Sequence, residues 1–145
     1  MNNPTEKQIK KFWEYFGFVS RGRSYTGKIL LVAPDELEWF DECVKDVDAG
    51  GYTRMPEKDR HYSPLPITLN NLSRYAIPKL DSFELEYDYR MSTEERSAHG
   101  QIITHSDYIY TALAILGVNT ASAEDKDPAL ASFWAIFQVI RLARR

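Results

Sequence analysis

Residues 83–90, FELEYDYR, alternate strictly between apolar or aromatic side chains and charged ones. Successive side chains of a β-strand point to opposite faces of a sheet, whereas a helix repeats every 3.6 residues. The alternation therefore predicts a strand with one apolar face and one charged face. A chain that contains such a strand needs a sheet, and it also needs other elements that cover the apolar face.

Two amphipathic helices near the chain ends are the candidates for that cover. Residues 5–16 begin with a capping box and carry one apolar stripe. Residues 127–145, DPALASFWAIFQVIRLARR, begin with Asp127 as a good N-cap, followed by a proline at the first helical position. The wide apolar face of residues 127–145 predicts contact with the sheet. We expect Trp13 and Trp134 to be interior.

The remaining segments complete an α+β pattern with a small antiparallel sheet. Residues 108–116 are apolar on both faces, which fits a central strand or a helix, and their Tyr, Ile and Thr content favours the strand. The other expectations are a hairpin at 17–34, a helix at 35–48, a loop at 52–66, a helix at 69–76 capped by Thr68, a connecting loop at 91–100, a strand at 101–105 and a polar linker at 117–126.

Composition limits the classes of function. A length of 145 residues suits one domain, and a net charge of −3 excludes a generally basic surface for nucleic acid, so we expect no direct nucleic-acid binding. The single cysteine cannot form an intramolecular disulfide, which is consistent with the cytoplasm. No window approaches the ~20 apolar residues of a transmembrane helix, so no membrane association is expected.

Three segments together carry a resemblance to a known family. IKKFWEYFGF at 9–18, LPITLNNLSRYAIPKL at 65–80 and DPALASFWAIFQVI at 127–140 are similar in order and spacing to the phage ABA-sandwich domain family, which comprises small proteins of phages and prophages. The resemblance implies a single domain over residues 1–145 with a three-layer α/β/α arrangement, and a phage setting. It supplies no catalytic residue. Because a sheet covered on both faces should not contain so polar a strand, residues 83–90 lie either at the sheet edge or with a charged face that is only partly covered, and we favour the edge.

The chain departs from the family pattern at about residues 33–62, which we interpret as an insert with an acidic helix. Residues 35–48 hold seven acids and one lysine, and Leu37 and Phe40 line one side of the expected helix. Three interpretations stay open: an amphipathic helix with its acids in water, a protein interface anchored by Trp39 and Phe40, or mimicry of nucleic-acid phosphates. The candidate partner-binding residues are Asp35, Glu36, Glu38, Trp39, Phe40, Asp41 and Glu42.

Tyrosines and arginines suggest a second kind of site. Stacking rings and guanidinium groups suit a nucleotide pocket. The tyrosines concerned are Tyr52, Tyr62, Tyr87, Tyr89, Tyr108 and Tyr110, of which we expect half or more to be core. The candidate ligand-binding residues are Arg54, Arg60, His61, Tyr62 and Arg90.

The sequence thus favours a non-enzymatic phage or prophage accessory protein, with counter-defence as one role. It would bind a host protein or associate with itself in the cytoplasm. The alternative is a protein that binds a small nucleotide signal, and a hydrolase or nuclease that uses Asp, Glu and His is less favoured. None of the three histidines has the spacing of a zinc-binding helix, and no residue is assigned to catalysis, a cofactor or a metal.

Overall fold

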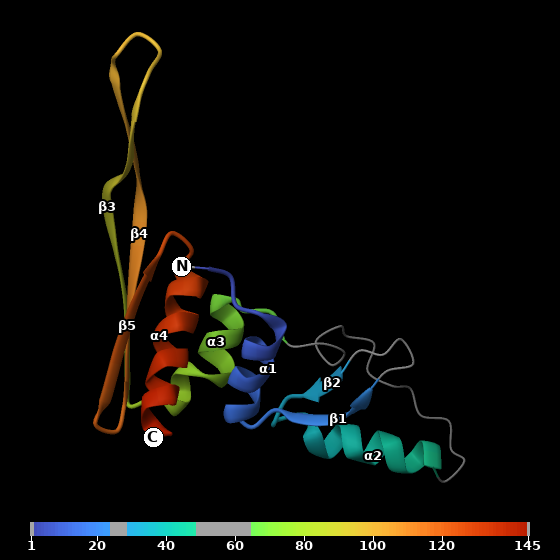
Figure 1. Cartoon of the computed structure of the whole chain (residues 1–145). Helices are drawn as coiled ribbons and strands as arrows, with labels where there is room; N and C mark the ends of the chain where they lie inside the picture. Colours follow the sequence, from blue (N-terminus) through green and yellow to red (C-terminus); the bar gives the residue numbers. More distant parts are fainter. Residues whose placement is uncertain (1, 24–28, 49–64, 145) are drawn as a thin grey trace. The chain divides into compact units, whose positions relative to one another are not determined.

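The computed structural model describes residues 2–23, 29–48 and 65–144. The contacts within the chain divide it into two compact units, Pro4–Pro66 and Met1–Asn3 together with Ile67–Arg145. Each unit combines helices with a small antiparallel sheet, so the predicted α+β class is confirmed (Figure 1). The single domain and the three-layer arrangement implied by the family resemblance stay predictions.

The unit Pro4–Pro66 contains two helices and a two-stranded antiparallel sheet among its described residues. Its elements are α1 (Glu6–Tyr15), β1 (Val19–Arg23), β2 (Ile29–Val32) and α2 (Leu37–Asp48). Both helices and the hairpin lie where the sequence predicts them. The capping box of α1 is confirmed, because the N–H of Gln8 donates to Oγ1 of Thr5 at 3.2 Å and the N–H of Thr5 donates to Oε1 of Gln8 at 2.9 Å. Of the expected loop, residues 52–64 lie outside the described residues.

Trp13 of α1 is fully buried, as the sequence predicts. Its ring packs against those of Phe12 and Phe18, with centroids 4.9 Å and 5.0 Å away. The indole N–H donates to the backbone oxygen of Leu65 at 2.7 Å. A buried indole N–H without an acceptor would be destabilising, so this bond ties the end of the unit to α1.

The other unit contains a three-stranded sheet and two α-helices. Its elements are α3 (Leu69–Tyr75), the 3₁₀-helix η2 (Ile77–Lys79), β3 (Ser82–Arg96), β4 (Ile102–Leu116), β5 (Asn119–Asp125) and α4 (Pro128–Ala143). The strands pair antiparallel in the order β3–β4–β5. The strand predicted at 83–90 therefore lies at the edge of the sheet, as expected.

Helix α4 packs on β4 and β5 and supplies the core of this unit. Its buried residues include Phe133 and Ile136, and the buried alanines of β4 and β5 allow the helix to approach the sheet closely. The predicted cap is present, because Oδ1 of Asp127 accepts the N–H of Ala129 at 2.8 Å. Trp134 is only partly buried, and its indole N–H donates to the backbone oxygen of Asn2 at 3.0 Å.

The β3–β4 hairpin is longer and more continuous than the sequence predicts. The segment 91–100 is not a connecting loop, because β3 continues to Arg96 and the chain turns only between Ser97 and Gln101. The strands predicted at 101–105 and 108–116 are confirmed, and they belong to one strand, because β4 runs unbroken from Ile102 to Leu116. The segments 91–96 and 102–107 lack the regular alternation of apolar and polar residues on which a sequence prediction depends.

The segment 117–126 is not a polar linker, because it contains strand β5. The buried side chains of β5 are Ala121 and Ala123, which alternate with exposed polar residues. Alanine is a weak strand former and its small side chain gives little apolar signal. The strand forms because α4 covers these alanines.

Candidate protein-interaction surface

The β3–β4 hairpin extends beyond the part of the sheet where β5 pairs with β4 and α4 packs on both strands (Figure 1). The last residue of β4 that pairs with β5 is Tyr110, opposite Asp125. Beyond it, residues 88–96 and 102–109 pair only with each other among the described residues, and we call these two segments the ribbon. A two-stranded ribbon buries little apolar surface and is only marginally stable by itself. The ribbon is therefore an exposed element that extends past the three-stranded part of the sheet.

Four tyrosines form a cluster at the base of the ribbon. Tyr87 lies opposite Tyr110, and Tyr89 lies opposite Tyr108, so all four side chains share one face of the hairpin. The ring of Tyr108 lies 5.6 Å from that of Tyr87 and 5.1 Å from that of Tyr89, between centroids. Tyr110 is 6.1 Å from Tyr87. We call these four residues the tyrosine cluster.

The tyrosine cluster is largely open to solvent. Tyr87 is 68% exposed, Tyr89 62% and Tyr108 48%, whereas Tyr110 is partly buried. None of the four is therefore a buried core residue. Each ring offers an apolar face and a hydroxyl group that can donate or accept, which is the combination that protein interfaces favour.

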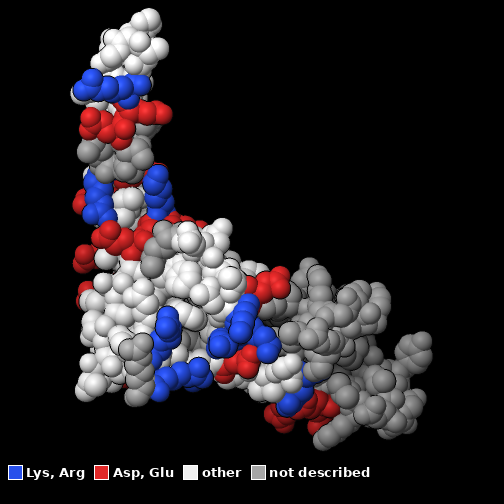
Figure 2. Space-filling view, viewed as in Figure 1, with Lys and Arg blue, Asp and Glu red and all other residues white. Residues whose placement is uncertain are grey.

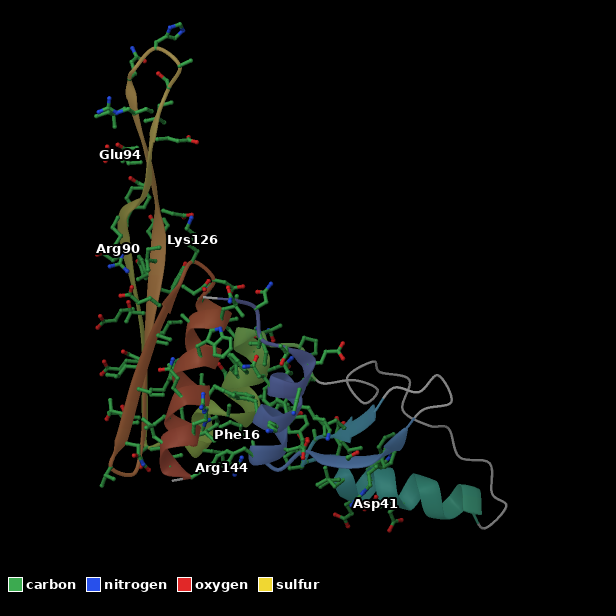
Figure 3. All side chains as sticks on the ribbon, viewed as in Figure 1. Phe16, Asp41, Arg90, Glu94, Lys126 and Arg144 are labelled. Carbon is green, nitrogen blue, oxygen red and sulfur yellow. The ribbon has the colours of Figure 1, made fainter. Side chains whose placement is uncertain are left out.

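The opposite face of β3 carries a row of acids. Glu84, Glu86 and Asp88 are exposed and form no ion pair with another described residue; we call them the acidic row. Further along this face, Arg90 lies 2.7 Å from Oε2 of Glu124. Acidic and basic groups are mixed along the hairpin in Figure 2, and Arg90 and Glu94 project from the ribbon in Figure 3.

A change of register interrupts β3 between Met91 and Thr93, where it has one residue more than β4. Such a bulge bends and twists a strand and commonly protects a sheet edge. Beyond it, the exposed residues include Ile102 and Ile103 of β4. The regular, unbulged part of the β3 edge is thus the part that carries the acidic row and Tyr87 and Tyr89.

Helix α2 carries the partner-binding residues predicted in the other unit. Trp39 is 50% exposed, but Phe40 is 3% exposed and packs with Leu37 and Val32. Phe40 thus holds α2 on its own unit and is not available as a surface anchor. Asp41 accepts from Arg21 of β1 in a bidentate pair, with both N–O distances 3.0 Å (Figure 3). The remaining acids that the sequence singled out are exposed or partly exposed: Asp35, Glu36, Glu38 and Glu42.

The predicted nucleotide site lies mostly outside the described residues and stays a prediction. Arg54, Arg60, His61 and Tyr62 lie outside the described residues. The fifth candidate, Arg90, is described, and its guanidinium is paired with Glu124. The described ranges hold no group of three or more His, Cys, Asp or Glu side chains that could bind a metal ion. No helix within them is both long enough and apolar enough to cross a membrane.

Comparison with known protein families, with curated proteins and with solved structures gave no match to this chain. The similarity to phage ABA-sandwich proteins therefore stays a prediction.

Sequence reasoning missed the ribbon and gave the tyrosines a different role. The sequence suggests Tyr87, Tyr89, Tyr108 and Tyr110 as part of a nucleotide pocket, and it does not indicate that they pair across one hairpin. The signal that indicates the cluster is spacing. Two Tyr-x-Tyr pairs occur in neighbouring antiparallel strands, and they lie face to face once the hairpin has its register.

Proposed function

We propose that this protein acts without catalysis, by binding another protein, and that the tyrosine cluster is its main contact surface. The observation that carries the proposal is the exposure of Tyr87, Tyr89 and Tyr108 on one face of a hairpin that extends past its own core. Tyrosine supplies a large, rigid contact area at a low entropic cost. Adjacent exposed aromatic side chains are typical of binding surfaces.

Trp39 provides a second contact in the proposal. Its half-exposed indole stands on α2 among exposed acids, a surface suited to a protein with basic groups at its rim. The proposal does not use Phe40, because it belongs to the core of its unit. The partner is a host protein or a second copy of the chain.

The proposed setting is a phage or prophage in the cytoplasm of its host, with counter-defence as one role. The resemblance of three segments to phage ABA-sandwich proteins supports this setting. A nucleotide ligand is not favoured by any described contact, and neither is a hydrolytic reaction. The proposal concerns protein binding, which the described surface supports.

The proposal is tested with the variant Tyr87→Ser/Tyr89→Ser/Tyr108→Ser. The matched control replaces three other exposed side chains, as Ser73→Ala/Ser122→Ala/Val118→Ser. Sedimentation of the purified proteins measures self-association, and capture from host lysate followed by binding of the purified partner measures hetero-association. We expect the tyrosine variant to lose the complex while the control retains it. A complex that both variants retain would contradict the proposal.

A further inference from the structure

We propose that the free edge of β3 binds an extended segment of the partner protein as an added fourth strand. In this segment basic and apolar side chains alternate. The inference rests on the proposed protein-binding function and deepens it, because it names the chemistry of the partner and the form in which it binds. It concerns the regular stretch of β3 before the bulge, from Ser82 to Arg90.

The edge itself is the first argument. β3 pairs with β4 on one side, and no other described strand lies along its opposite side. Backbone N–H and C=O groups of a strand point alternately to its two sides, so those on the open side of β3 have no ladder partner within the described sheet. Proteins commonly bind extended peptides at such edges, where main-chain bonds give affinity and alternate side chains give specificity.

The chemistry of the occupant follows from the side chains that flank the edge. On one face, the acidic row presents three carboxylates at every second residue. On the other face, Phe83 and Leu85 are partly buried, and Tyr87 and Tyr89 are exposed. Directly opposed cross-strand side chains share a face, so an added strand places alternate residues against these two rows. Cationic residues fit the acidic row, and apolar residues between them fit the aromatic row.

The same charges disfavour a second copy of the chain as the occupant. If two β3 strands paired antiparallel about Glu86, Glu84 of one copy would face Asp88 of the other, and the two Glu86 residues would face each other. Like charges directly opposite each other are destabilising. A pairing shifted toward the ribbon would include the bulge between Met91 and Thr93, which interrupts the ladder. A partner with basic side chains avoids the repulsion between like charges. Binding to the unbulged stretch avoids the interrupted ladder.

The test uses the full chain and a labelled, end-blocked peptide about ten residues long in which Lys alternates with Val, a usual length for one strand. Fluorescence anisotropy measures its binding. We expect Glu84→Gln/Glu86→Gln/Asp88→Asn to weaken binding by about tenfold or more, because three close attractions are lost. The control Glu6→Gln/Glu14→Gln/Glu94→Gln removes the same charge elsewhere, and we expect its affinity to stay within about twofold. An equal loss in both variants would overturn the proposal.

Two further peptides test strand addition itself. They carry backbone N-methyl groups at the odd or at the even positions, which remove alternate N–H donors. Only one of the two sets faces β3 in an added strand, so we expect one peptide to lose binding and the other to retain it. Equal binding by both would overturn strand addition. The loss of a complex in the tyrosine variant described above would still support the proposed function in that case.

The inference would also be overturned if the unmethylated Lys–Val peptide did not bind. A dimer of the free protein that forms through β3 would overturn it as well. Sedimentation of the free protein distinguishes the latter outcome, which would identify the occupant as a second copy. Retention of the complex in the tyrosine variant is the separate result that would reject the proposed function.

Discussion

Tyr89 of β3 and Tyr108 of β4 lie opposite each other in the hairpin register, with ring centroids 5.1 Å apart. Tyr89 is 62% exposed and Tyr108 is 48% exposed. The pair thus makes an aromatic contact on the surface and leaves most of its area to solvent. Side chains in this position add little to the stability of the chain, and they are available to a partner.

The first prediction separates surface tyrosines from core aromatics in the same unit. Tyr89→Ala should lower the free energy of unfolding by only about 1 kcal/mol, because it loses little more than exposed ring contacts. Phe133→Ala, at a fully buried position of α4, should lower it by about 3–5 kcal/mol. Urea denaturation followed by circular dichroism measures both. Similar losses for the two variants would mean that the tyrosine cluster is structural.

A second prediction concerns the two tryptophans of the unit Pro4–Pro66. Trp13→Phe leaves the backbone oxygen of Leu65 without its donor, so the free energy of unfolding should fall by about 1–3 kcal/mol. Trp39→Phe changes a half-exposed ring and should alter it by less than about 0.5 kcal/mol. The comparison requires urea titrations of the two variants beside the parent protein. A larger loss of unfolding free energy for Trp39→Phe would show that this ring stabilises the fold and does not serve a contact surface.

A third prediction tests the cap that begins α4. Asp127→Ala removes the carboxylate that accepts the N–H of Ala129 and should lower the free energy of unfolding by about 1 kcal/mol. Asp127→Asn keeps an acceptor oxygen, and asparagine is as good an N-cap, so this variant should stay near the parent. Thermal and urea denaturation give both values. Equal destabilisation by alanine and asparagine would show that the loss of stability does not come from this hydrogen bond.

The bidentate pair between Arg21 and Asp41 leads to a fourth prediction. Both side chains are partly exposed, so their coupling should be only about 0.2–1 kcal/mol despite the two 3.0 Å contacts. A double-mutant cycle with Arg21→Gln and Asp41→Asn measures this coupling, and it should decrease as salt is added. Coupling well above that range, or coupling that salt leaves unchanged, would contradict the surface character of the pair.

Much of the fold can be predicted from local pattern. The alternation of residues 83–90 predicts a strand, and the caps of α1 and α4 lie at Thr5 and Asp127 as predicted. The apolar stripe that includes Leu37 and Phe40 likewise predicts which side of α2 is buried. In each case a short segment contains both the signal and its physical cause.

The missed elements depend on contacts between distant segments. Strand β5 forms because α4 covers Ala121 and Ala123, which have little strand preference by themselves. The ribbon beyond the bulge lacks a regular alternation of apolar and polar residues, so its pairing is visible only in the register of β3 and β4. The tyrosine cluster depends on the same register. The four tyrosines are visible in the sequence, but the face that they share is not.

The most direct test of the central claim is photo-crosslinking in host cells. A photoreactive phenylalanine analogue replaces Tyr89 in one sample and Val118 in the other. Val118 is 99% exposed and lies in the turn between β4 and β5, so it controls for exposure alone. We predict a covalent adduct with one defined polypeptide at position 89 and none above background at position 118. The absence of an adduct at position 89, or the same adduct at both positions, would contradict the assignment of the tyrosine cluster as the binding surface.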